Sequence, residues 1–457
     1  MRRLILILTE CVLLLVLGLL ATFLRLGREA NLWPLDPLLG ARLLLVTLVV
    51  QLSFYLFDLY DLGKIRSYRS VLAKIAYALP AATVILSLIF FVTPRTQLGR
   101  GVFLLFVAMA IAVVPFWRLL AGWGMRHPEL GVRERVLILG SGRLAIEIAK
   151  ATLERTNAGF QIVGFVDNKP DLVGKSLINP SVLGLTRDIG QLVERHDVHR
   201  IVVAVEDRRG QFPTEDLLDL SLSGRVAVEE CARYYERLTG KIASEMLRPS
   251  WLIFSRNSRY SEIAGHIRRL MNFGLALIGF VLSLPLMILT AIAVKCDSSG
   301  PLFYIQERVG QNGRRFRIVK FRSMRSDAEE SSGPVWAEED DPRITRVGRV
   351  IRKIRFDELP QFINIMRGDM NFVGPRPERP KFVDELSTQI PYYPQRHLVK
   401  PGLTGWAQIK YPYGSSVEDA IEKLRYDLYY IKNQSPLLDA IILLETVKIV
   451  MFGRGAR

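Results

Sequence analysis

The chain has 457 residues, of which 49% are hydrophobic, and its mean hydropathy of +0.20 is high for a water-soluble protein. Its length allows two or three folded units, and its formal net charge of +16 suits anionic lipid headgroups and phosphate-bearing ligands better than nucleic acid, which we do not expect as a partner. Neither a disulfide framework nor a zinc site is expected, because the histidines lack metal spacing and the cysteines lie far apart in sequence, at Cys11, Cys231 and Cys296.

Four apolar runs occupy the first 125 residues, and each is close to the roughly 20 residues that a helix needs to cross a bilayer. They are Leu4–Leu24, Leu38–Leu56, Val71–Val92 and Val102–Leu120. Basic residues gather before the first run, after the second and after the fourth, where Arg118 is the first of them. By the positive-inside rule these sides are cytoplasmic. The first run is long for a signal peptide and lacks a small-residue cleavage site, so residues 1–125 are predicted to form four transmembrane helices.

Residues 126–248 show the alternating pattern of an α/β domain of the Rossmann-like class. A short apolar strand leads into the turn Gly140-Ser141-Gly142, and the next predicted strand ends at Asp167. The glycines permit a tight turn close to a pyrophosphate, and the aspartate can bind a ribose, so Gly140, Gly142 and Asp167 are candidate nucleotide-binding residues. Ala145 replaces the third glycine of the motif, and no Tyr-x-x-x-Lys pair follows. We therefore favour a structural or regulatory domain without a bound cofactor.

A polar connector at 249–268 leads to a fifth apolar run, Leu270–Val294, for which two topologies are open. Its length fits another membrane span. Basic residues flank both of its ends, however, and a crossing would leave a basic domain outside the cell. Pro285 removes a helical N–H and predicts a kink, and Ser283 can satisfy freed backbone groups at membrane depth. The properties of the run alone favour a spanning helix and a re-entrant helix equally.

The last segment carries the chemically informative residues. Seven basic residues and no acidic ones lie from Arg308 to Arg325, and an acidic loop, Asp327–Asp341, separates them from a second basic stretch. Asp357 and Glu358 follow, just before an apolar helical pattern. The commoner role of such an aspartate is a helix N-cap. Because a helix N-terminus also attracts phosphate, the same position suits a nucleophile or a metal ligand.

Arg376 stands between Pro375 and Pro377, which stiffen the backbone that presents it. A guanidinium held in this way can bind a phosphate through two hydrogen bonds. Paired carboxylates among cations suit phosphoryl transfer, in which a metal and guanidinium groups hold phosphates while a carboxylate attacks or relays a proton. The sequence therefore predicts a membrane enzyme of phosphoryl transfer. A final apolar run, Leu437–Phe452, predicts an amphipathic helix that lies on the membrane or on a partner.

The order of motifs over residues 268–457 resembles the bacterial sugar transferase family, the monotopic polyprenyl-phosphate hexose-1-phosphate transferases. After the apolar run with its proline come QERVG, KFRSM, DPRITRVGRVIRK, DELPQ, GDMNFVGPRPE and KPGLTGWAQ. The four membrane helices and the Rossmann-like domain are similar to the large subclass of that family. The resemblance implies a re-entrant membrane helix at 269–295, broken at Ser283 and Pro285, and a monotopic α/β catalytic domain at 296–457.

The resemblance also implies a reaction and its residues. A hexose-1-phosphate would move from a UDP-sugar to undecaprenyl phosphate with release of UMP, in the presence of Mg²⁺, to begin exopolysaccharide, capsule or O-antigen synthesis. Asp357 would be the covalent nucleophile and the magnesium ligand, Glu358 would support it, and phosphate groups would be held by Lys320, Arg352 and Arg376. We also expect a homodimer in the bacterial inner membrane, in contact with membrane lipids, with its catalytic domain in the cytoplasm.

Two other functions fit parts of the sequence. A membrane-anchored NAD-dependent nucleotide-sugar epimerase or dehydratase would need a catalytic Tyr/Lys pair after Gly142, which the sequence lacks. A non-enzymatic assembly or regulatory protein would tolerate replacement of Asp357. Neither alternative explains the carboxylate pair together with Arg376.

Overall fold

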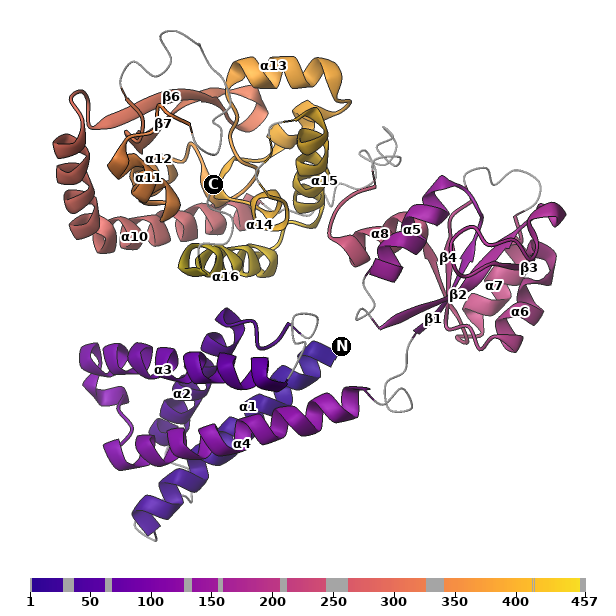
Figure 1. The fold of residues 1–457 in the computed structure, drawn as a ribbon, viewed down its shortest axis with the longest axis horizontal. Helices are drawn as coiled ribbons and strands as arrows, with labels where there is room; N and C mark the ends of the chain where they lie inside the picture. Colours follow the sequence, from indigo (N-terminus) through magenta and orange to yellow (C-terminus); the bar gives the residue numbers. More distant parts are fainter. Residues whose placement is uncertain are drawn as a thin grey trace. The chain divides into compact units, whose positions relative to one another are not determined.

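The computed structural model describes residues 2–27, 37–61, 68–126, 134–154, 159–205, 212–243, 262–325, 341–412, 414 and 416–452 (Figure 1). Most of the predicted acidic loop and most of the connector at 249–268 lie outside these residues. Contacts between residues divide the chain into two compact units. The second unit holds Ile138–Ala151, Phe165–Ile189 and Ile201–Arg457, so the division passes through the α/β domain.

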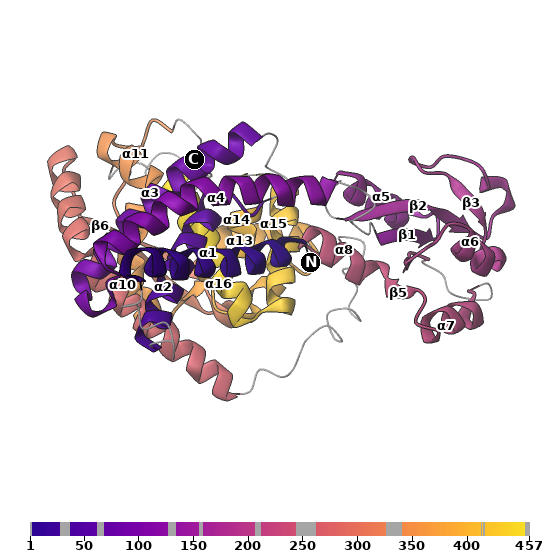
Figure 2. The same cartoon turned by 90° about the horizontal axis from the view of Figure 1, so that it is seen from below.

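Four long apolar helices form the N-terminal bundle, as predicted. They are α1 (Arg2–Leu26), α2 (Pro37–Leu56), α3 (Tyr68–Val92) and α4 (Arg100–Arg126), and both views of the ribbon show them side by side (Figures 1 and 2). Each is long and apolar enough to cross a membrane. Large side chains fill the space between the helices, among them Leu14, Phe54 and Phe106.

Arg118 stands at the end of the fourth apolar run and lies inside α4, which continues to Arg126, rather than in a cytoplasmic loop. Its guanidinium is buried and forms an ion pair with the Glu10 carboxylate on α1 at 2.7 Å. The role assigned to Arg118 from the positive-inside rule was therefore wrong. A charge buried inside a bundle needs a partner of opposite charge, and Glu10 supplies it.

The α/β domain contains one five-stranded sheet in the order β3-β2-β1-β4-β5, and β2 and β3 run parallel. Its elements are β1 (Glu134–Leu139), α5 (Arg143–Glu154), β2 (Phe160–Asp167), β3 (Val182–Leu185), α6 (Ile189–Arg195), β4 (Arg200–Val203), α7 (Thr214–Leu222), β5 (Ala227–Glu230) and α8 (Cys231–Thr239). The last four residues of β1 are fully buried, which is typical of a strand inside a parallel sheet. An α/β domain with a parallel sheet is thus confirmed.

The C-terminal domain begins with α10 (Glu262–Asp297) and a hairpin of β6 (Phe303–Val309) and β7 (Arg315–Phe321). The short helices α11 (Arg346–Lys353) and α12 (Phe362–Arg367) follow, with a 3-10 helix, Phe356–Gln361, between them. The parallel strands β8 (Asn371–Val373) and β9 (Gly402–Thr404) form a second small sheet. The remaining elements are α13 (Pro380–Gln389), the 3-10 helix Tyr393–Leu398, α14 (Trp406–Lys410), α15 (Val417–Asn433) and α16 (Pro436–Phe452).

Helix α10 contains the fifth apolar run and has Pro285 inside it. The ribbon of α10 bends between its two halves (Figures 1 and 2), which is the expected effect of a proline that removes a helical hydrogen bond. The Ser283 hydroxyl donates to the Phe280 carbonyl at 3.1 Å, within the same turn. Ala276 and Met287, one in each half, are buried against the catalytic domain, while much of the remaining surface of the helix is apolar and exposed.

Helix α16 forms where the sequence predicts a helix, but it is not amphipathic. Its apolar residues lie on all sides, so no polar face separates from an apolar one. Ile442 is fully buried in a cluster with Trp406 and Tyr430, whereas Leu437 and Met451 are exposed. The helix therefore contributes to the domain core and also presents apolar surface.

Candidate active site

The carboxylate pair lies in the 3-10 helix Phe356–Gln361, which follows α11. The chain enters this helix through Arg355, whose φ of 62° is in the left-handed region, and this sharp turn directs the next residues toward β7. Asp357 and Glu358 are 8% and 7% exposed. Asp357 lies in the first turn of the 3-10 helix, whose N-cap is Arg355, so its predicted N-cap role was wrong.

Helix α11 is held at this place by two interactions at its N-terminus. Thr345 accepts a hydrogen bond from the Gly348 N–H at 2.9 Å, and the Asp297 carboxylate at the end of α10 accepts one from Val347 at 3.0 Å. A Cβ at Gly348 would lie 2.0 Å from the Ser323 carbonyl oxygen, which only glycine avoids. The membrane helix, the end of β7 and α11 are thus fixed together next to the carboxylates.

Glu358 is the centre of a cluster of cations. Its Oε1 lies 3.0 Å from Lys320 Nζ, 3.2 Å from an Arg376 guanidinium nitrogen and 3.5 Å from an Arg355 guanidinium nitrogen. Burial alone would raise the pKa of Glu358, but Lys320, Arg376 and Arg355 outweigh it and hold that pKa well below its usual range. Burial also lowers the pKa of Lys320, and Glu358 opposes this effect. Glu358 is therefore a permanently ionised anchor for the cations.

Asp357 has a different environment from its neighbour. Its Oδ1 is buried and has no hydrogen-bond partner among the described residues. Burial, followed by the charge of Glu358, raises the pKa of Asp357 to about 6, although Lys320, Arg355 and Arg352 oppose the shift. The direct contacts of Lys320, Arg355 and Arg376 are to Glu358. At pH 7 Asp357 is still mostly ionised, and a poorly solvated carboxylate with an unengaged oxygen is suited to nucleophilic attack.

The structure brings together most of the predicted site residues. Lys320 on β7 and Arg376 after β8 meet at Glu358, and Arg352 on α11 is half-buried and close enough to Asp357 to influence its pKa. Ser283 and Pro285 belong to α10. Gly140, Gly142 and Asp167 belong to the α/β domain and line no part of the cavity beside Glu358.

The turn between β1 and α5 has the backbone geometry that its glycines predict. Gly140 has a φ of +112°, and a Cβ there would approach the Ala204 carbonyl oxygen to 3.0 Å. The Asp167 carboxylate is engaged by its own domain, because one oxygen accepts from the Ser141 hydroxyl and the other from the Lys169 N–H. A ribose would have to compete with these two donors.

A small cavity beside Glu358 shows two residues that the sequence analysis did not single out, Arg308 and Gln361. It is lined by Arg308, Ile318, Lys320, Glu358, Gln361, Arg376, Pro377, Gly402 and Leu403. Gln361 is 2% exposed, and its amide nitrogen has no partner among the described residues. Arg308 belongs to the motif QERVG and Gln361 to the motif DELPQ, and these motifs were the sequence feature that could have identified both residues. The cavity volume of about 10 Å³ holds at most about one water, so a substrate requires side chains to move.

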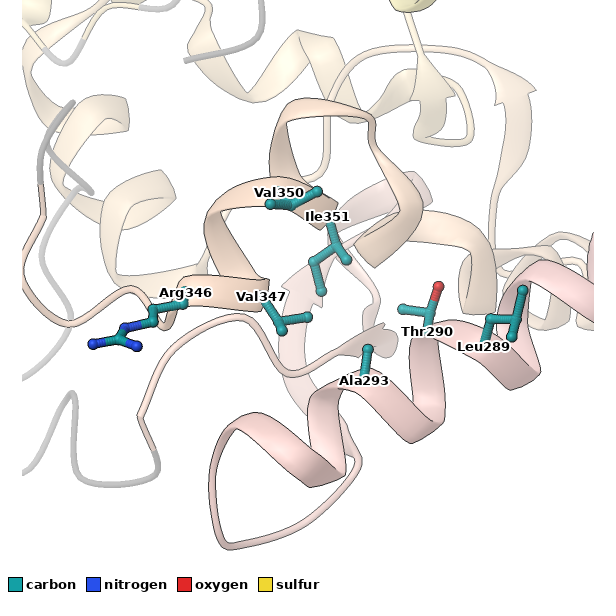
Figure 3. A pocket seen from close by; sticks show the side chains of 7 residues that line it. All are labelled: Leu289, Thr290, Ala293, Arg346, Val347, Val350 and Ile351. Atoms are coloured by element: carbon teal, nitrogen blue, oxygen red, sulfur yellow. The ribbon is translucent and has the colours of Figure 1, made fainter.

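A larger groove of about 480 Å³ lies between α10 and α11. Figure 3 shows Leu289, Thr290 and Ala293 of α10 on one side and the apolar side chains of α11 on the other, with Arg346 pointing away at one end. No carboxylate lines the groove, whereas Glu358 lines the small cavity.

Comparison with known proteins identifies related sequences. Residues 263–453 match the family model of bacterial sugar transferases, and residues 55–210 match that of a CoA-binding domain. An undecaprenyl-phosphate glucose phosphotransferase from Komagataeibacter xylinus is 30% identical over 92% of this chain and 80% of its own length. A UDP-glucose:undecaprenyl-phosphate glucose-1-phosphate transferase from Xanthomonas campestris pv. campestris is 30% identical over 78% of this chain and 75% of its own.

A third relative is more similar over a shorter region. It is a UDP-N-acetylgalactosamine-undecaprenyl-phosphate N-acetylgalactosaminephosphotransferase from Aeromonas hydrophila, 40% identical over 59% of this chain, and the alignment spans 62% of that relative's length. Membrane helices, a parallel α/β domain and a domain with the carboxylate pair among cations occur in the order that the sequence predicts. The chain belongs to the bacterial sugar transferase family and is a phosphoglycosyl transferase.

Proposed function

We propose that this protein transfers a hexose-1-phosphate from a UDP-sugar to undecaprenyl phosphate and releases UMP. The product is a polyprenyl-diphosphate-linked sugar, which begins exopolysaccharide, capsule or O-antigen synthesis. The observation that carries this proposal is the contrast within the carboxylate pair: Asp357 has a buried oxygen that no described residue hydrogen-bonds, while Glu358 binds three cations next to it. The names of the related transferases support the same pair of substrates.

The reaction proceeds in two displacements. The Asp357 carboxylate attacks the sugar-linked phosphorus, the bond from phosphorus to the bridging oxygen breaks, and that oxygen leaves with its electron pair as part of UMP. The phosphate oxygen of the lipid then attacks the same phosphorus, and the bond to Asp357 breaks and restores the carboxylate. Lys320 and Arg376 hold the phosphate oxygens, and Arg352 adds positive charge beside Asp357.

Glu358 keeps these cations in position before the donor arrives. It holds Lys320 and Arg376 through its Oε1, next to the small cavity. When the donor binds, its phosphates provide stronger acceptors for both cations, and Glu358 continues to balance their charge. Because Glu358 holds the cations, Asp357 can act as the nucleophile without holding them as well.

Magnesium fits this site with help from the substrate. Among the residues that the structure describes, no group of three His, Cys, Asp or Glu side chains could hold a metal ion. Mg²⁺ is commonly bound by one or two carboxylates together with substrate phosphates, and Asp357 offers an oxygen without a partner. Asp357 would therefore be its protein ligand, and the ion would supply positive charge that offsets the charge of the diphosphate.

The membrane arrangement follows from the same proposal. The five long apolar helices among the described residues indicate a membrane protein. In our proposal α10 enters the cytoplasmic leaflet of the inner membrane and returns at Pro285, which keeps both flanking basic segments inside. The donor is soluble and the acceptor is an anionic lipid, so a basic site at headgroup height meets both. A homodimer, with the α/β domain in a supporting or regulatory role, completes the proposal.

The test is a two-stage assay on the purified protein. UDP-glucose, UDP-galactose and their N-acetylated forms are supplied with label in the sugar-linked phosphate, first without lipid. We expect the preferred donor to release UMP, leave label on the protein and pass it to lipid when undecaprenyl phosphate is added. Asp357→Asn should trap no label, with Asp369→Asn as a control carboxylate outside the cavity. Release of UMP only when both substrates are present would support direct transfer instead.

A further inference from the structure

The segment that presents Arg376 is held through its carbonyl groups. Pro375 and Pro377 have no N–H, so the backbone on both sides of Arg376 cannot donate hydrogen bonds. Instead, four successive carbonyl oxygens accept one each. Two of the donors are backbone groups: the Gly402 N–H donates to the Pro375 carbonyl at 2.9 Å, and the Val309 N–H donates to the Glu378 carbonyl at 3.0 Å. The other two are guanidinium groups: Arg396 donates to the Arg376 carbonyl and Arg308 to the Pro377 carbonyl, both at 3.2 Å.

Arg396 makes the contact to the Arg376 carbonyl from inside the protein. It lies on the 3-10 helix Tyr393–Leu398 and is 5% exposed. The nitrogen that donates to Arg376 also lies 2.8 Å from a carboxylate oxygen of Asp427 on α15, and a second guanidinium nitrogen donates to the Tyr393 hydroxyl. Asp427 is 1% exposed. A buried arginine is thus held by a buried aspartate and used to fix the backbone of an active-site residue.

Stability alone is a poor explanation for this pair. Removing two charges from water costs free energy that their attraction often fails to offset. The Arg396 Nε has no hydrogen-bond partner among the described residues, so the pair is not fully satisfied. Burial raises the pKa of Asp427 to about 6, and Arg396 opposes that shift. A pair of this kind suits a task that needs a rigid, directional donor.

We propose that Arg396 and Asp427 are positioning residues, which set the Arg376 guanidinium for the phosphate of the donor. This inference rests on the proposed function of the cavity beside Glu358. Arg396 fixes the carbonyl, the flanking prolines fix the backbone, and Glu358 holds the guanidinium at 3.2 Å until the donor replaces it. Neither Arg396 nor Asp427 lines the cavity itself.

The test is a double-mutant cycle between Arg396→Lys and Arg376→Ala in the full-length protein. Lysine keeps the charge beside Asp427 but cannot reach the carboxylate, the hydroxyl and the carbonyl with one planar group. We expect Arg396→Lys to lower kcat for UMP release by about 100-fold, since small misplacements of a phosphate-binding group have effects of this size. In the Arg376→Ala background the same substitution should have no further effect, because the residue that it positions is absent.

Arg425→Lys is the matched control. Arg425 is also a buried arginine, and it lies on α15, the helix that carries Asp427. Its partners are Glu422, Glu147, Tyr235 and the Ile242 carbonyl, so its replacement perturbs α15 without touching the Arg376 segment. We expect its kcat to stay within about twofold of wild type. Additive effects of Arg396→Lys and Arg376→Ala, or an equal loss in Arg425→Lys, would overturn the positioning role.

Calorimetric titration with UDP provides a readout that does not depend on turnover. We expect Arg396→Lys to weaken UDP binding by about tenfold, the effect of losing roughly one charge-assisted hydrogen bond, and to leave it unchanged when Arg376 is already alanine. A folded Asp427→Asn variant should lose UDP affinity to the same extent as Arg396→Lys. If the wild type binds UDP but releases no UMP from any UDP-sugar, the proposed function fails, and the titration still decides the positioning role.

Discussion

At the scale of single residues, two adjacent carboxylates have opposite properties because of where their partners lie. Glu358 faces Lys320, Arg355 and Arg376, and its pKa is lowered. Asp357 is equally buried but receives none of those direct contacts, and its pKa is raised to about 6. The separation of an anchor from a nucleophile therefore results from side-chain direction rather than from residue type.

Removal of the Arg376 guanidinium should affect chemistry and leave the fold intact. Its side chain is about one third exposed and forms an ion pair with Glu358, so we expect Arg376→Ala to create no core cavity. We expect turnover to fall by about 10²- to 10³-fold, as for other lost donors to a charge that develops in the transition state. Rates of UMP release and thermal unfolding curves of both proteins measure the two effects. Normal turnover of the folded variant would remove Arg376 from the site.

Asp357→Asn should stabilise the protein while it abolishes turnover. The folded-state pKa of about 6 lies above the usual value of 3.8, so the folded state binds the proton more tightly than the unfolded state. Stability contributed by this group is therefore complete below about pH 4 and is lost as pH rises through 6. Above pH 7 the asparagine variant should gain up to about 3 kcal/mol, corresponding to a shift of roughly two units.

Thermal unfolding of wild type and Asp357→Asn at several pH values between 4 and 8 measures this difference. Asp427 also has a raised pKa, but it is present in both proteins and its contribution cancels. The stability gap should widen from pH 4 to about pH 7 and then stay constant. A gap that narrows as pH rises would mean that the cations, rather than burial, control Asp357.

Local motifs singled out Asp357, Glu358 and Arg376 as candidates, and the family resemblance added Lys320. The sequence could not show that three cations share one oxygen of Glu358, since these residues come from separate elements. The sequence also could not show that the backbone carbonyl groups on both sides of Arg376 accept hydrogen bonds. Arg396 and Asp427 stand in segments without a distinctive pattern, and their relation appears only when the 3-10 helix Tyr393–Leu398 meets α15.

At the scale of elements, strongly patterned segments were predicted well. The four N-terminal helices and the helix that became α10 follow from apolar length, and the parallel sheet follows from the strand and glycine pattern. The errors arose where tertiary partners decide the outcome. Arg118 is inside α4 because Glu10 neutralises it, and α16 lacks a polar face because part of it is buried in the catalytic domain.

Helix α10 provides a prediction about topology. Both ends of the run Leu270–Val294 should label from the cytoplasmic side. Cys296 is exposed near one end, and Gly265→Cys adds a label near the other, where a Cβ meets no atom within 4 Å. Cys11 and Cys231 are replaced by serine in this background. Labelling of the two sites from opposite faces of sealed vesicles would establish a spanning helix.

Pro285→Leu is the matched variant for this experiment. Leucine restores the helical N–H and removes the ring that clashes with the preceding turn, so the two halves of α10 should align toward a straight span. Labelling of Cys296 should then decrease from the cytoplasmic side and appear from the other. Unchanged labelling would show that contacts of Ala276 and Met287 with the catalytic domain, rather than Pro285, set the bend.

At the scale of the whole molecule, the end of the α/β domain is part of a hydrophobic core of the catalytic domain. Ile242 is 1% exposed in a cluster with Leu386 and Leu424, and the Gly240 carbonyl accepts a hydrogen bond from the Trp406 indole at 2.7 Å. Glu236 forms an ion pair with Lys432 on α15 at 2.9 Å. No residue of this set lines the small cavity, and we expect its contribution to be to stability.

A protein that begins near Ser261 should therefore keep transferase activity in nanodiscs but unfold more readily than the full chain. It retains Lys320, the carboxylate pair and Arg376, and it loses the burial of Ile242. Ile242→Ala in the full chain is the matched control, and we expect it to cost about 2–5 kcal/mol, as for other buried aliphatic side chains reduced to alanine. UMP release per folded molecule should be similar in the full chain, the truncated protein and Ile242→Ala, while their unfolding temperatures should differ. Complete loss of activity in a folded truncated protein would show instead that the turn from Gly140 to Asp167 has a role in catalysis.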